Sequence, residues 1–300
     1  MKKRLLFLCA MGMVLPTSIH ATSMVYNFRI AQITKQDIFN KDGGDKNYSV
    51  VALLFNVIRK KYHGDVQQYF LGTLDSFIYD FRENYYFRTD FAVSAIKEKT
   101  EGITTFHDVE TDDLLFSLGR NLHVNDKASL TFTALLGLPT HVPYRLRHLE
   151  LGLAQVGIGG QLDGSYAWNS RDAFLFGARY VYFVPRTLHN TVDQQFRFTY
   201  GNMGDVLVAY KHNWPKKHGI EFGYTTKFRF GAHIHPFVPE VAKKSDYIRS
   251  NWYSVYKYRF AIKEVANKLL FNIAYGFDHQ PHQFGNKYIV TIWGSWIVNF

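Results

Sequence analysis

The chain has 300 residues, of which 17% are aromatic and 20% charged, and its formal net charge at pH 7 is +10. Its mean hydropathy is −0.19, and after residue 21 it lacks a run of about 18 apolar residues, which excludes a membrane-spanning helix there. Cys9 is the single cysteine, which excludes an intramolecular disulfide.

The first 21 residues have the pattern of a secretory signal peptide. Lys2, Lys3 and Arg4 precede the apolar run 5–16, which is too short to span a bilayer, and Ala21 is a small residue at a suitable cleavage point. We predict cleavage after Ala21. The mature chain then keeps 32 basic and 25 acidic residues, a formal charge of +7.

Segments of about ten residues with alternating apolar and polar residues recur along the rest of the chain. In 154–168, for example, Leu162 and Tyr166 share one parity and Asp163 has the other. A period of two predicts strands whose two faces meet different environments. The predicted strands are 25–34, 66–79, 85–96, 113–123, 129–138, 154–168, 173–184, 205–214, 218–230, 251–262, 268–278 and 288–300.

The connections between these segments alternate in length. Tight connections are predicted at 82–84, 125–127, 169–171, 215–217 and 264–267, and long ones at 97–112, 139–150, 185–204, 232–247 and 279–286. Trp168 and Trp214 each precede a tight connection and share the parity of the apolar face. Aromatic residues so placed are typical of a membrane–water interface.

The last predicted strand, 288–300, is the most distinctive segment. One of its parities is apolar and ends at the C-terminal residue; it comprises Tyr288, Val290, Ile292, Gly294, Trp296, Val298 and Phe300. This segment resembles the terminal strand that the barrel-assembly machinery reads in bacterial outer-membrane proteins. Together with the signal peptide, it makes residues 25–300 resemble an outer-membrane β-barrel of the porin-like or transporter-like kind.

The resemblance implies an all-β fold, an antiparallel transmembrane β-barrel, placed in the bacterial outer membrane after signal-peptide-directed export. In such barrels short turns face the periplasm and long loops face outside, and single-chain bacterial barrels have an even number of strands. Segment 48–59 is apolar without alternation and ends in Arg59-Lys60-Lys61. We therefore predict twelve strands in one domain, 22–300, with a non-barrel insert at 35–65. The competing interpretation makes 48–59 a strand and 22–47 a periplasmic or plug segment.

The polar parity of the strands predicts the residues that line the lumen. They are the acids Asp90, Asp163, Asp205, Glu221 and Asp278 and the basic residues Arg29, Arg88, Arg179, Lys211, Lys287, Lys227, Arg229, Lys257 and Arg259. The last four lie on two consecutive strands, so we expect them to form one basic patch. Glu221 lies six residues from Lys227, about 20 Å along a strand, so we expect it not to neutralise the patch directly. A basic constriction favours anions over cations.

The sequence lacks a strong catalytic motif. Twelve-stranded outer-membrane phospholipases carry a His-x-Ser pair, and no His of this chain is followed two residues later by Ser. Asp278-His279 resembles the pairs of outer-membrane proteases only as a single dipeptide, and Ser165 and Ser295 have no His at matching spacing. We therefore expect no enzyme activity and no catalytic residues.

Two further classes of site have weak support. His233 and His235 have the spacing of two zinc or copper ligands on a strand, but we expect solvated loop histidines, no bound metal and no other cofactor. Basic residues are dispersed and form no recognition motif, so nucleic acid is not an expected partner.

The sequence thus predicts an outer-membrane channel that passes small polar, preferably anionic, solutes. The expected partners are outer-membrane lipids, lipopolysaccharide, the barrel-assembly machinery and the solutes themselves. Two alternatives stay open: a non-conducting structural or adhesive barrel that acts through its extracellular loops, and a membrane-embedded lipid-modifying enzyme.

We predict that Phe300→Asp impairs assembly, because the terminal aromatic strand is the expected assembly signal. The measurement is the fraction of protein that migrates as a heat-modifiable species in outer-membrane preparations, compared between the variant and the parent. Insertion of Phe300→Asp at the parent's level would contradict the barrel assignment of this segment.

Overall fold

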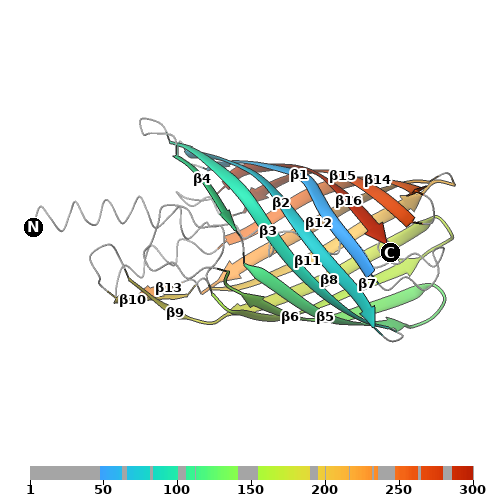
Figure 1. Ribbon diagram of the computed structural model, residues 1–300, viewed down its shortest axis with the longest axis horizontal. Helices are drawn as coiled ribbons and strands as arrows, with labels where there is room; N and C mark the ends of the chain where they lie inside the picture. The colour runs from blue at the N-terminus through green and yellow to red at the C-terminus, as the bar shows by residue number, and fades with distance from the viewer. Residues whose placement is uncertain are drawn as a thin grey trace, which may run out of the picture.

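The computed structural model describes most of the chain from residue 48 onward as β-strands (Figure 1). The described residues are 48–62, 66–81, 84–100, 106–111, 113–140, 155–189, 195–199, 201–215, 217–231, 233–235, 247–262, 265–279 and 286–299. Within them no helix is long and apolar enough to cross a membrane. The predicted strand 25–34 and Phe300 lie outside the described residues.

Twelve strands form one antiparallel ring (Figure 1). In order around it they are β1 (Tyr48–Tyr62), β2 (Val66–Phe81), β3 (Tyr85–Thr100), β5 (Leu114–His123), β6 (Ala128–Leu138), β7 (Gly157–Ala167), β8 (Asp172–Phe183), β11 (Asn202–Asn213), β12 (His218–Phe230), β14 (Tyr247–Ile262), β15 (Val265–Asp278) and β16 (Asn286–Asn299). Because β1 pairs with β16 as well as β2, and β2 pairs with β3, each strand has two neighbours. The predicted twelve-stranded antiparallel barrel is confirmed.

Four shorter strands lie outside this count. β4 (Phe106–Thr111) pairs with β3 beyond the part of β3 that pairs with β5, so β4 and β5 share one position in the ring. β9 (Arg186–His189), β10 (Gln195–Thr199) and β13 (His233–His235) form a separate three-stranded sheet. This sheet lies at the end of the barrel opposite to the C-terminus (Figure 1).

Four of the five tight connections lie where they were predicted; the fifth is shorter than the predicted 264–267, because β14 ends at Ile262 and β15 begins at Val265. β2–β3, β5–β6, β7–β8, β11–β12 and β14–β15 are each joined by a short turn. Asn84 and Lys217 adopt left-handed backbone conformations in two of them, with φ of 82° and 58°; asparagine tolerates this conformation well. We call the end with these turns the periplasmic end and the other the extracellular end, following the usual arrangement in such barrels.

Alternation of burial separates an inner from an outer face. Along β8, Leu175 and Arg179 are buried, whereas Phe174 and Tyr180 are exposed. Trp168 and Trp214 are 66% and 45% exposed beside periplasmic turns, as the sequence predicted. An apolar, aromatic outer face with a polar inner face is the pattern of a barrel that stands in lipid.

The C-terminal strand β16 follows the same alternation. Ile292 and Trp296 are exposed, whereas Trp293 and Ile297 are buried. Of the remaining described members of the predicted assembly parity, Tyr288, Val290 and Val298 are half-buried, and Gly294, which has no side chain, is buried. The apolar parity recognised in the sequence is therefore the outer face of the strand.

Segment 48–59 is not an insert, contrary to our prediction; it is a strand, as in the competing interpretation. It forms most of β1, which pairs with β2 on one side and β16 on the other and so completes the ring. The register with β16 shifts between Leu53 and Phe55, which marks a β-bulge. A bulge reverses the relation between parity and face partway along a strand, so the period of two is not visible in the sequence.

Candidate functional site in the barrel interior

Most predicted lumen residues lie on the inner face and are buried. Those that are at most 8% exposed include Arg88, Arg179, Lys227, Arg229 and Lys257. Arg259 is half-buried. Arg29 lies outside the described residues. The inner position of these side chains follows from strand alternation, and their role in lining a conducting path remains a prediction.

Arg88 is held by two side chains near the periplasmic end of β2 and β3. Its Nε donates to Asp90 Oδ1 at 2.6 Å, and its Nη2 donates to Ser76 Oγ at 2.9 Å. Ser76 also donates to Asp90. Arg88 and Asp90 lie two residues apart on one strand, so they share its inner face.

A second ion pair joins β8 to β11. Arg179 Nη2 lies 2.6 Å from Asp205 Oδ2, and Arg179 Nε donates to the same oxygen at 2.8 Å. The two residues are directly opposite in the strand register. Both side chains are 1% exposed, so the pair is almost fully removed from solvent.

Glu221 on β12 holds two side chains of β14. Lys257 Nζ donates to Glu221 Oε2 at 2.7 Å, and the Tyr253 hydroxyl donates to Glu221 Oε1 at 2.8 Å. Glu221 is opposite Val255 in the register, so its two partners are the inner-face residues on either side of Val255. The expectation that Glu221 would not neutralise the basic residues is therefore wrong for Lys257.

The expected single basic patch is also wrong. Strands β12 and β14 are antiparallel, and their register places Lys257 opposite Gly219 but Lys227 opposite Arg249. Gly219 and Lys227 are eight residues apart along β12, about 26 Å at 3.3 Å per residue. Lys227 and Arg229 thus lie toward the extracellular end, and Lys257 and Arg259 near the periplasmic end.

Buried charges are concentrated on one side of the ring. Strands β8, β11, β12, β14 and β15, which are consecutive in the sheet, carry seven buried basic residues and two buried acids among the described residues. We call this surface the cationic wall; its basic residues are Arg179, Lys211, Lys227, Arg229, Arg249, Lys257 and Lys268. Elsewhere in the described barrel, the buried charges are Arg88, Asp90 and Asp113.

Two members of the cationic wall were not predicted from the sequence. β14 begins at Tyr247, four residues before the predicted start, so Arg249 was assigned to a loop. Lys268 is the first residue of the predicted strand 268–278 and shares the parity of the polar Asn272, so its parity was the signal that could have identified it. Both side chains are buried, at 7% and 3% exposure.

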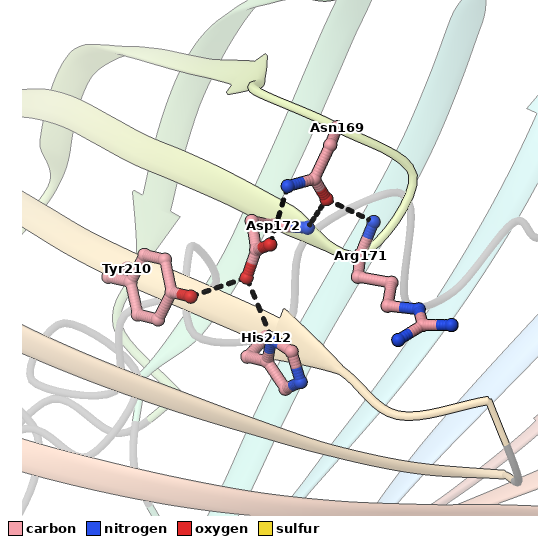
Figure 2. A network of polar contacts seen from close by, with 5 residues as sticks. All are labelled: Asn169, Arg171, Asp172, Tyr210 and His212. Atoms are coloured by element: carbon pink, nitrogen blue, oxygen red, sulfur yellow. Dashed lines mark hydrogen bonds and ion pairs between the residues drawn. The ribbon is translucent and has the colours of Figure 1, made fainter.

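A polar network lies on the outer side at the periplasmic turn before β8 (Figure 2). Asp172 contacts His212 Nδ1 at 2.7 Å, accepts from the Tyr210 hydroxyl, and accepts from Asn169 Nδ2 at 2.7 Å. Asn169 Oδ1 accepts from the backbone N–H groups of Arg171 and Asp172. The network fixes the turn.

The hydroxyl and histidine groups that suggested catalysis form other contacts. Ser165 is hydrogen-bonded to Ser129, with 2.8 Å between their Oγ atoms. His279 Nε2 is hydrogen-bonded to Ser250, which also contacts the Tyr224 hydroxyl. Ser250 has 0% exposure, so its Oγ is covered rather than presented to an ester or amide.

Histidines near the extracellular end do not form a recognisable metal site in the described residues. His233 and His235 lie opposite Thr199 and Arg197 in the backbone register of the small sheet. Within the described ranges, no group of three or more His, Cys, Asp or Glu side chains is placed to hold a metal ion.

Comparison with known proteins identifies the fold. No family model and no curated protein sequence matches the chain. The COG4313 outer membrane channel from Pseudomonas putida F1 superposes with a TM-score of 0.65 at 11% identity, over 86% of this chain and 99% of that one. The translocator domain of the autotransporter NalP from Neisseria meningitidis gives 0.55 at 10% identity, over 97% and 99%. The chain therefore has the fold of outer-membrane β-barrel proteins.

Proposed function

We propose that this protein is an outer-membrane channel that passes small polar solutes and prefers anions. The observation that carries the proposal is the charge of the inner face, where eight buried basic residues stand against four buried acids among the described residues. Fixed positive charge on the wall of a pore lowers the energy of an anion inside it and raises that of a cation.

Three buried ion pairs lie along the wall of the barrel, an arrangement that suits a conducting lumen. Arg88 pairs with Asp90 on the same strand, and Arg179 and Lys257 pair with acids on the adjacent strand. All three pairs therefore run along the wall, where they stiffen it without joining opposite sides of the lumen. Low dielectric around the buried charges strengthens their field on a solute.

The alternative function is a non-conducting barrel that acts through its extracellular loops. The observation in its favour is the sheet of β9, β10 and β13, which is formed by two connections at the extracellular end. Such an ordered platform suits adhesion or contact with a surface ligand. In either function, the proposed partners include outer-membrane lipids, lipopolysaccharide and the barrel-assembly machinery, and the proposed route is export by the signal peptide.

Single-channel recording in planar bilayers separates the two functions. A conducting barrel gives discrete current steps after addition of refolded, heat-modifiable protein, and heat-unfolded protein from the same preparation serves as the control. We expect steps from the folded protein only. A folded protein that inserts without any conductance would favour the loop-mediated alternative.

We also propose that the barrel is not an enzyme, and we predict that the purified refolded protein leaves phospholipid, lipid A and peptide substrates intact. The physical reason is that Ser250, the serine hydrogen-bonded to a histidine among the described contacts, is fully covered. Ser250→Ala, His279→Ala, Asp278→Asn, Ser165→Ala and Ser295→Ala should behave like the parent. Hydrolysis by the parent that any of these variants abolishes would contradict the proposal.

A further inference from the structure

The periplasmic turn before β8 ends in an acidic residue that a turn of this kind does not require. Asn169 Oδ1 accepts from the backbone N–H of Asp172 at 2.9 Å. The turn before β6 is closed in the same way, since Asn125 Oδ1 accepts from the backbone N–H of Ala128 at 2.8 Å. Alanine there has the position that Asp172 has before β8, so the Asp172 carboxylate is not needed to close the turn.

The Asp172 carboxylate lies on the outer face of the barrel and is partly exposed. The strand register places Asp172 opposite His212 of β11, and its side chain is 22% exposed. Three side chains contact its oxygens, namely those of Asn169, Tyr210 and His212 (Figure 2). A carboxylate offers about four acceptor positions. Among the described contacts, one position on Asp172 therefore remains for a further donor.

Aromatic side chains flank this carboxylate on the outer face. Trp168 contacts Phe174 with 6.0 Å between the ring centroids, and Phe174 contacts Tyr210 at 5.8 Å. Beside them, His212 meets Trp214 edge to face at 5.1 Å. The two tryptophans are 66% and 45% exposed, as is typical of a membrane–water interface. A ligand of the carboxylate would thus lie at the level of lipid head groups, beside aromatic rings whose faces attract cations.

Arg171 adds a cation to the same turn. It directly precedes Asp172 and is exposed. Figure 2 shows no hydrogen bond or ion pair between its guanidinium and the other residues drawn. A guanidinium is well suited to bind phosphate oxygens. The turn therefore presents a phosphate-binding group and a carboxylate on adjacent residues, and a head group with a phosphate and an ammonium carries the complementary charges.

From this arrangement we infer that the turn binds the head group of a zwitterionic phospholipid with a primary ammonium, in the periplasmic leaflet. The site, which we call the head-group site, consists of Arg171, Asp172, Tyr210, His212 and Trp214. Asp172 accepts a hydrogen bond from the ammonium, and Arg171 binds the phosphate. Because the site is on the outer face, lipid reaches it from the bilayer, and the inference is independent of the proposed channel.

The chemistry of the site distinguishes ethanolamine from two other head groups. A choline head group has the same charges, but its ammonium has no N–H to donate to the remaining acceptor position of Asp172. A glycerol head group has no cation to offset the carboxylate, so its phosphate alone would meet a site that contains an acid. The head-group site therefore favours phosphatidylethanolamine over phosphatidylcholine and phosphatidylglycerol.

The experiment places the refolded protein in vesicles with equal amounts of phosphatidylethanolamine and phosphatidylcholine that have the same acyl chains. Native mass spectrometry after release in mild detergent then counts the lipids of each kind that stay bound. We expect the parent to retain phosphatidylethanolamine in roughly fivefold excess, the ratio that one exposed ion pair gives at the upper end of its usual range. In a second mixture phosphatidylglycerol replaces phosphatidylcholine, and the preference should keep its direction.

Two variants with matched controls test the location. Asp172→Asn removes the charge and keeps the size of the side chain, so the ratio should fall close to one. Arg171→Gln should reduce the amount of both bound lipids and keep their ratio, because both carry the phosphate. Asp126→Asn and Lys127→Gln make the same changes in the turn before β6, where both residues are exposed, and should behave like the parent. Heat-modifiable migration checks that each variant is folded.

The outcomes separate this inference from the proposed function. A folded parent that retains phosphatidylethanolamine and phosphatidylcholine equally, or that prefers phosphatidylglycerol, overturns the inference whether or not Asp172→Asn folds. A preference that persists in folded Asp172→Asn also overturns it and leaves Asp172 a structural role between β8 and β11. A conducting barrel without the preference contradicts this inference alone, and a non-conducting barrel with the preference contradicts the proposed function alone.

Discussion

Glu221→Met is expected to destabilise the barrel by about 3–5 kcal/mol, the usual effect of removing one partner from a buried ion pair. Glu221 is 0% exposed and accepts from both Lys257 and Tyr253. Without the carboxylate, the buried ammonium of Lys257 loses its counter-charge and the Tyr253 hydroxyl loses its acceptor. The measurement is the free energy of unfolding in urea, followed by tryptophan fluorescence in lipid vesicles.

The double variant Glu221→Met, Lys257→Met sharpens this prediction. Replacing a buried pair by apolar side chains of similar volume is often neutral or stabilising, so the double variant should be clearly more stable than Glu221→Met. This non-additivity is the signature of a direct interaction. Asp126→Asn, at an exposed turn residue, is the control and should stay within about 0.5 kcal/mol of the parent. Additive effects of the two single variants would contradict the assigned pair.

Neutralising part of the cationic wall is expected to remove the selectivity of the channel. The variant replaces four basic residues by glutamine, namely Lys211, Lys227, Arg229 and Lys268. Arg179 and Lys257 are kept, so that Asp205 and Glu221 each retain a directly bonded cation. Among the described buried residues, four basic side chains would then face four acids. The permeability ratio of chloride to potassium should fall to about one, because the net field that separates anions from cations is lost.

The control for this variant makes the same change in net charge on exposed residues. Arg120, Lys127, Arg171 and Lys217 are exposed, on the outer face or in periplasmic turns, where water and salt screen them. Their replacement by glutamine should leave the permeability ratio near that of the parent. Equal shifts in the two variants would show that total charge, rather than the wall, determines selectivity.

Strand parity predicted the architecture well, because each strand alternates between lipid and lumen. The predicted strand 218–230 coincides with β12, and the inner position of Arg179 and Lys257 follows from counting in twos. β1 was missed for a physical reason: the bulge after Leu53 breaks the count, and apolar residues of both parities conceal the strand. Alternation is informative only where the register is unbroken.

The candidate site was predicted less well, because parity gives the face of a residue but not its height in the barrel. Lys227 and Lys257 share the inner face, yet the antiparallel register separates them toward opposite ends of their strands. The pairing of Glu221 with Lys257 arises across two strands and is invisible in distances counted along one strand.

The most direct test of an anion-preferring channel is the zero-current potential of the folded parent protein across a planar bilayer with a tenfold potassium chloride gradient. Because the inner face carries an excess of positive charge, we expect chloride to permeate more easily than potassium. The zero-current potential should therefore have the sign that chloride permeation produces. A potential of the opposite sign, which potassium permeation produces, would contradict the account.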